Sequence, residues 1–88
     1  MNKEEFTAQL SRQGFGSLVE VEREPNGMMD LHSHPFDSKA LILEGEIRLM
    51  IAGAERVYRS GEVFELSSGT GHVEYYGPQG VRYLVGRK

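Results

Sequence analysis

Residues 28–37 read MMDLHSHPFD and place two histidines, His32 and His34, two positions apart. Successive side chains of an extended strand point to opposite faces, so both imidazoles face the same way if this segment is a strand. The third and last histidine, His72, lies in a separate strand-like segment. Neutral imidazole is the commonest protein ligand for zinc, iron, nickel and copper. The three histidines therefore predict one metal site, provided that the two strands are neighbours.

The residues around the histidines form two spaced patterns. The first is G-x4-H-x-H-x3-S-x6-G from Gly27 to Gly45, and the second is G-x5-S-x-G-x2-H-x3-Y from Gly61 to Tyr76. Over roughly residues 18–86 they resemble the two motifs of the cupin family, G-x5-H-x-H-x3,4-E-x6-G and G-x5-P-x-G-x2-H-x3-N. The chain departs from these motifs at four points. One residue fewer precedes the first histidine, and the family's glutamate, proline and asparagine are replaced by Ser38, Ser67 and Tyr76.

The resemblance implies an all-β fold, the cupin double-stranded β-helix or jelly-roll barrel, with the three histidines facing its interior. It also implies a divalent metal ion, and zinc, iron, manganese and nickel all suit a site rich in imidazole. Similar cupins include enzymes of several reaction classes as well as binding and sensor domains, so the fold selects no single reaction.

The fourth metal ligand is the least determined part of the predicted site. A serine hydroxyl is a poor ligand, so Ser38 does not replace the family's glutamate. Asp37 precedes it and lies on the wrong face of a regular strand, but a bulge at Pro35 would turn the Asp37 carboxylate inward. We therefore include Asp37 among the candidate ligands. The alternatives are a solvated Asp37 and a three-histidine site completed by water.

Glu74 follows His72 by two residues, so the alternation that turns His72 inward turns Glu74 inward as well. A carboxylate inside a small barrel needs a metal, a water or a cation as its partner. We expect Glu74 to transfer protons if the protein is an enzyme, or else to be a further metal ligand. Tyr76 continues this face and is a candidate to bind a ligand, or is ordinary packing. On the strand that contains His32 and His34, the same alternation predicts three more inward side chains: Asp30, Phe36 and Ser38.

Residues 1–14 carry the pattern of a short helix. Asn2 is a good N-cap and Glu5 follows three residues later, as in a capping box. Phe6 and Leu10 form a narrow apolar stripe, and Gly14 fits the left-handed position that ends a helix. A helix of about three turns is unstable alone in water, so its apolar stripe must dock. We expect it to cover the open end or the flank of the barrel, or to form a dimer contact.

From residue 17 the pattern has a period of two. About eight short strands are predicted within residues 17–86, with turn signals between them, as is typical of an all-β sandwich or barrel. Residues 40–43 are apolar throughout, which predicts a strand covered on both faces. We expect a break at Glu44-Gly45 and a turn over residues 77–80.

Composition limits the class of protein. A chain of 88 residues predicts a single domain over residues 1–88, and a domain this short gains stability as a homodimer. The absence of cysteine excludes disulfides and thiolate zinc sites. The net charge is −3, with acidic and basic residues interspersed, unlike the basic face of a nucleic-acid-binding protein. The sequence contains neither a membrane-spanning apolar run nor a signal peptide, so we expect a cytoplasmic protein without nucleic-acid or membrane partners.

Two functions of different classes fit these features. The first is a metal-dependent enzyme that acts on a small polar metabolite. The second is a non-catalytic ligand-binding or sensor module in which the metal only orients the ligand. The form of the cavity separates these possibilities, because it is either open and polar beside the histidines or plugged by Phe36, Met50 and Tyr76.

Overall fold

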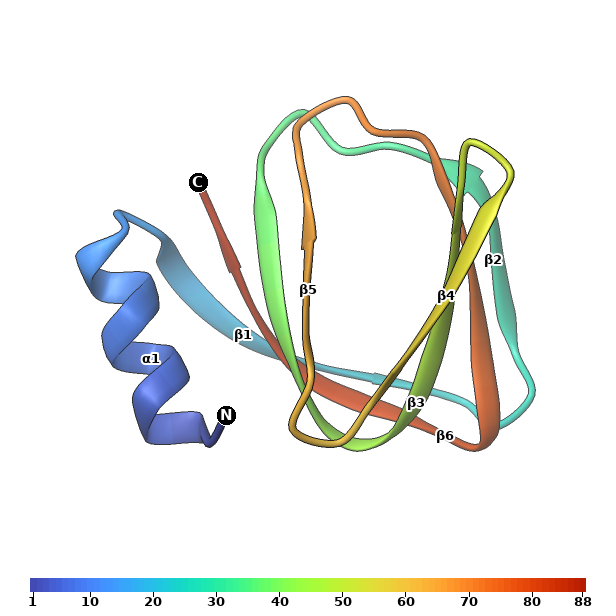
Figure 1. The fold of residues 1–88 in the computed structure, drawn as a ribbon, viewed down its shortest axis with the longest axis horizontal. Coiled ribbons are helices and arrows are strands. Elements are labelled where there is room, and N and C mark those ends of the chain that lie inside the picture. The colour runs from blue at the N-terminus through green and yellow to red at the C-terminus, as the bar shows by residue number, and fades with distance from the viewer.

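Every other strand of the fold pairs with one of two long antiparallel strands. The computed structural model describes residues 1–88, and its long strands are β3 (Ser38–Ile51) and β6 (His72–Arg87). The first half of β3 and the second half of β6 form one sheet with two shorter strands, β5 (Val63–Leu66) and β1 (Gly16–Arg23). The other halves form a second sheet with β4 (Ala54–Arg59) and β2 (Met28–His32). Figure 1 shows the resulting barrel, which confirms the predicted all-β double-stranded β-helix.

Both long strands bend where they pass from one sheet to the other. Gly45 has a φ of 75°, and a Cβ added there would collide with the carbonyl of Gly80. Gly80 also has a φ of 75°, and a Cβ there would lie 2.5 Å from the carbonyl oxygen of Arg23. Only glycine permits this close approach of three backbones.

The predicted break at Glu44-Gly45 and turn over residues 77–80 are wrong as chain reversals. Strand pairing becomes irregular near Gly45 and then resumes, with Ile47 opposite Tyr76. The glycines and proline in these segments allow a bend within a continuous strand. The eight predicted strands are therefore six, because β3 and β6 each contribute a strand to both sheets.

The inner core lies between the two sheets. Alternation places Ala40 and Ile42 inside the barrel, while Leu41 between them points outward, and all three are at most 1% exposed. The prediction that residues 40–43 are covered on both faces is confirmed for these three side chains. The inner core also contains the following residues: Ile47, Leu49, Phe64, Leu66, Tyr76, Val81 and Tyr83.

The helix α1 (Lys3–Arg12) covers the flank of the barrel and lies outside it, beside β1 (Figure 1). Its start is capped as predicted, because the Asn2 side chain accepts a hydrogen bond of 2.9 Å from the backbone N–H of Glu5. Phe6 and Leu10 are fully buried in a second, outer cluster with two sheet residues, Leu41 and Leu84. This helix is neither long nor apolar enough to cross a membrane.

Candidate metal centre

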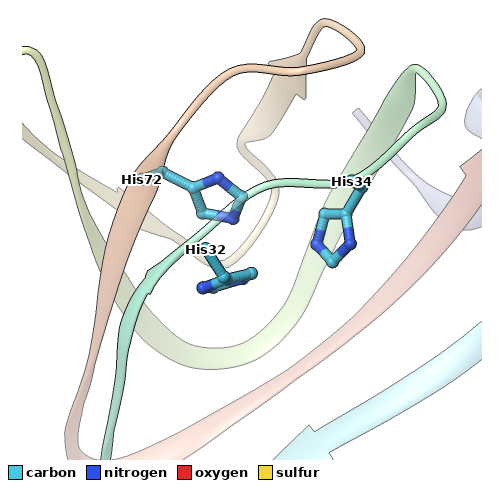
Figure 2. A group of neighbouring side chains, drawn as sticks. All are labelled: His32, His34 and His72. Atoms are coloured by element: carbon cyan, nitrogen blue, oxygen red, sulfur yellow. The ribbon is translucent and has the colours of Figure 1, made fainter.

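The three histidines meet at one end of the barrel. His32 ends β2 and His72 begins β6, and the two residues are direct partners across the antiparallel ladder. His34 lies in the loop after β2, where its carbonyl accepts a hydrogen bond of 2.8 Å from the N–H of Gly69. The three imidazoles face one another (Figure 2), and their candidate ligand nitrogens all lie within 4.8 Å of one another. The group could therefore hold one metal ion.

A bulge in β2 sets the direction of His32. The pairing of β2 with β6 shifts between Met29 and His32, so that these two residues both line the barrel's cavity. Asp30 is exposed, and its carboxylate accepts a hydrogen bond of 2.8 Å from the N–H of Leu31. The expectation that Asp30 faces inward is wrong, because the extra residue of the bulge reverses the strand's parity. The other two side chains predicted on this face, Phe36 and Ser38, do line the cavity.

Backbone carbonyls fix the tautomers of two histidines. Nδ1 of His32 lies 2.7 Å from the carbonyl oxygen of Asp30, and Nδ1 of His72 lies 3.0 Å from that of Thr70. A carbonyl can only accept, so both Nδ1 atoms carry hydrogen. In the neutral ring Nε2 is then left with a free lone pair, which is the usual arrangement of a metal-binding histidine.

The Glu74 carboxylate lies against both Nε2 atoms. Its Oε2 is 3.1 Å from Nε2 of His32 and 3.2 Å from Nε2 of His72. Only the contact with His72 has hydrogen-bond geometry, and Nε2 of His32 is buried without any hydrogen-bond partner. Lone pairs facing a carboxylate oxygen repel it, so a cation is needed between them, whether a proton or a metal ion. The donor set therefore fits a divalent metal.

The surroundings of His34 favour its neutral form. Burial lowers its pKa below the ordinary value, and the neighbouring charges of His32 and His72 lower it further. The ring stacks on Phe36, with 5.1 Å between the ring centroids and 18° between the ring planes. A neutral imidazole is the form that coordinates a metal, so this environment favours His34 as a ligand.

Asp37 lies outside the histidine group. Its Oδ1 accepts a hydrogen bond of 2.8 Å from the N–H of Ser68, and its backbone pairs with Lys88 in both directions, at 3.0 and 2.9 Å. These bonds hold the loop after β2 against the loop before β6 and the C-terminal end of the chain. The Asp37 carboxylate, a candidate ligand in the sequence, instead stabilises this loop pair, and the group of residues close enough to share a metal contains only the three histidines.

Tyr76 contacts Glu74 and does not line the cavity. Its hydroxyl donates a hydrogen bond of 3.1 Å to Oε1 of Glu74. Burial raises the pKa of Tyr76, and the charge of Glu74 and their hydrogen bond raise it further, so the phenol remains a donor. Nearby Tyr83 behaves similarly, because burial and the charge of Glu74 raise its pKa to about 12. The structure thus places Tyr76 in contact with the Glu74 carboxylate, outside the wall of the cavity.

A cavity of about 100 Å³ adjoins the histidines. Phe36 forms part of its wall, whereas Met50 and Tyr76 do not, so the cavity is not plugged by these three side chains. Sequence reasoning missed two charged residues of the wall, Arg23 and Arg87. Alternation could have found them, because each continues the inward face of its strand.

Among the known proteins compared with this chain, only solved structures match it. No protein-family model matches the sequence, and no curated protein matches it either. An RmlC-like cupin from Shewanella frigidimarina matches 80% of this chain at 17% identity, with a TM-score of 0.68. The polyketide cyclase RemF from Streptomyces resistomycificus also matches 80% of the chain, at 28% identity and a TM-score of 0.68. The W96Y variant of oxalate decarboxylase from Bacillus subtilis matches 81%, at 22% identity and a TM-score of 0.66.

These proteins are longer than the present chain. The matched part covers 63% of the RmlC-like cupin, 52% of RemF and 20% of oxalate decarboxylase. What they share with the chain is the barrel, and the two spaced histidine patterns lie on that barrel at the positions described above. The chain therefore has the fold of a small cupin domain.

Proposed function

We propose that the three histidines bind one divalent metal ion and that the protein is a metal-dependent enzyme acting on a small polar metabolite. The observation that carries this proposal is the arrangement of Nε2 atoms. Those of His32 and His72 are freed by backbone contacts at Nδ1, and that of His32 is buried without a hydrogen-bond partner. A buried nitrogen without a hydrogen-bond partner lowers the stability of the fold unless a bound ion accepts its lone pair.

The chain's own residues have separable roles in this proposal. The chemistry that a divalent ion supplies in such a site is polarisation of a substrate oxygen. Glu74 is proposed to hold or move a proton at Oε2, because Oε1 already accepts the hydrogen bond of Tyr76. Tyr76 keeps that carboxylate in place, and a cavity of about 100 Å³ suits a compact substrate or a compact group of a larger one.

The identity of the metal is part of the proposal. Zinc, iron, manganese and nickel are the candidates, since all accept imidazole ligands. Manganese has support from a comparison, because a solved structure of Bacillus subtilis oxalate decarboxylase that matches 81% of this chain at 24% identity is described by its Mn(II) centres.

Elemental analysis of the purified protein tests the metal site. We expect about one divalent ion per chain, and a sharp loss of occupancy in His32→Ala, His34→Ala and His72→Ala, since each removes one of three protein ligands. Ser38→Ala is the matched control, because Ser38 lines the same cavity and should leave occupancy unchanged. Full occupancy in His72→Ala would contradict a shared site.

A screen of small metabolites separates the enzyme from the alternative, a binding or sensor module. Thermal shift of the metal-loaded protein identifies compounds that bind, and each hit is then incubated and analysed for chemical change. A compound that is converted supports the enzyme. Compounds that bind and are recovered unchanged favour the binding module.

A further inference from the structure

The cavity wall carries more positive than negative charge. Its charged residues are two arginines, Arg23 and Arg87, and one glutamate, Glu74. The glutamate already lies against two histidines and accepts a hydrogen bond from Tyr76. The whole chain, by contrast, has a net charge of −3. A cavity with more positive than negative charge in an acidic protein favours an anionic ligand, since a concave surface attracts the charge opposite to its own net charge.

The two arginines of the cavity have no carboxylate partner. Three other arginines on the barrel do have one: Arg48 pairs with Glu55, Arg59 with Glu46, and Arg82 with both Glu20 and Glu44. Arg12 and Arg56 are also unpaired, but they do not line the cavity; all four arginines are exposed on at least one side. Unpaired guanidinium groups that line a cavity are available to a ligand, and their planar geometry suits two parallel hydrogen bonds to an oxyanion.

Arg87 is the arginine linked to the histidines. Its guanidinium carbon lies 4.6 Å from the centre of the Phe36 ring, and that ring stacks on His34. Arg23 lies at the other end of the same strand pair, because Gly16 is opposite Arg87 and Arg23 is opposite Val81. A small ligand beside His34 therefore lies near the Arg87 side chain. Arg23 adds positive charge at the opposite end of the β1–β6 strand pair.

We propose that the cavity binds a compact organic carboxylate and that Arg87 pairs with its carboxylate group beside the histidines. This inference rests on the proposed function, because it takes the metal-bound side of the cavity as the reacting side. A cavity of about 100 Å³ is smaller than the ~150 Å³ engineered cavity that accepts benzene, so the part of the ligand inside it has few heavy atoms. The remaining walls include apolar side chains such as Val85 and Leu66, which suit a short carbon skeleton better than a second charged group.

Isothermal titration calorimetry with matched probes tests the charge of the ligand. The metal content of the protein is measured first, and acetate, glycolate and pyruvate are then compared with acetamide, glycolamide and pyruvamide. Each pair has nearly the same shape and differs in charge. We expect at least one carboxylate to bind at least about tenfold more tightly than its amide, as the loss of a charge-assisted hydrogen bond implies. Inorganic phosphate is titrated as a second oxyanion.

Arg87→Gln tests the residue. It should raise the Kd of the bound carboxylate about tenfold or more while leaving metal content and melting temperature unchanged. Arg56→Gln is the matched control, because Arg56 is also unpaired and stacks on an aromatic ring, that of Tyr58 at 5.0 Å, but lies outside the cavity. It should leave the Kd unchanged. Arg23→Gln should weaken binding less than Arg87→Gln does.

The outcomes separate this inference from the metal site. Metal-loaded protein that binds no carboxylate, or binds acid and amide equally, overturns the inference and leaves the metal centre standing. The inference is also overturned if phosphate binds more tightly than every carboxylate. It is overturned as well if Arg56→Gln raises the Kd of the carboxylate as much as Arg87→Gln does. Protein without metal in any preparation contradicts the proposed function instead, and carboxylate binding that depends on Arg87 would then still support the anion site.

Discussion

Oε2 of Glu74 lies within 3.2 Å of nitrogens from two histidines, while Oε1 of the same side chain accepts a hydrogen bond from Tyr76. The two oxygens therefore have different tasks. One is fixed by a donor that stays protonated, and the other faces the site where a metal and a substrate would meet. A carboxylate held in this way is suited to proton transfer, and it is also close enough to the histidines to become a fourth ligand.

Glu74→Gln distinguishes these two roles. The substitution keeps size and shape, so a proton-transfer role predicts nearly unchanged metal content and melting temperature with turnover reduced ~100-fold or more. A ligand role predicts that metal content falls together with turnover. The measurements are elemental analysis and the rate of conversion of a metabolite found by the screen. Glu65→Gln is the control, because Glu65 is an exposed strand glutamate and should change neither quantity.

At the level of single residues the sequence predicted those positions that depend on parity alone. His72 and Glu74 are two apart on a regular stretch of β6, and both are buried on the same face. Asp30 was misplaced because one extra residue in β2 reverses the alternation, and no sequence feature marks where that residue is inserted. The position of the Asp37 carboxylate was left open for a different reason. This carboxylate bonds with Ser68, a partner 31 residues away that only the folded loop pair brings near.

At the level of elements, the bends in β3 and β6 place the two halves of the site. They allow one strand to serve both sheets, so that His72 and Glu74 lie in one sheet and Arg87 in the other while all three line a single cavity. Glycine and proline correctly marked residues 77–80 as irregular. They could not show whether the chain reverses or bends, because that depends on the close approach of Gly45, Gly80 and Arg23.

Gly80→Ala tests this close approach. Residue 80 has a left-handed φ of 75°, which strains any residue other than glycine, and an added Cβ would also overlap the backbone of Arg23. We therefore expect the substitution to lower the free energy of unfolding by about 3 kcal/mol. Gly53→Ala is the matched control. Its φ is 79° but nothing lies within 4 Å of the added carbon, so it should lose only about 1–2 kcal/mol. Urea unfolding measures both, and equal losses would show that backbone conformation alone accounts for the glycine.

The whole molecule has two separate apolar clusters on opposite sides of one sheet. The inner cluster forms the barrel's interior, and the outer one exists only because α1 covers Leu41 and Leu84. Both clusters form because β3 and β6 have apolar residues on both faces, and each face must be covered. The amphipathic stripe of the helix was visible in the sequence. The choice among the open end, the flank and a dimer contact was not, because it depends on which sheet face is left uncovered.

Deletion of residues 1–14 should therefore destabilise the barrel without disturbing the histidines. Phe6 and Leu10 are fully buried, and truncating even one such side chain costs roughly 2–5 kcal/mol. For a domain of this size each kcal/mol lowers the melting temperature by about 4–8 °C, so the deletion should lower it by roughly 10 °C or more. Leu10→Ala should reproduce much of the loss, and Ser11→Ala, at the exposed neighbouring position, should not.

Light scattering on the same variants separates the two ways in which the helix could stabilise the protein. If α1 acts only by covering its own sheet, the oligomeric state of Leu10→Ala equals that of the unchanged chain while the melting temperature falls. If the helix also contacts a second copy, the melting temperature and the molecular mass fall together. A deletion variant that melts at the same temperature as the full chain would contradict both roles, because Leu41 and Leu84 would then be exposed to water at no cost.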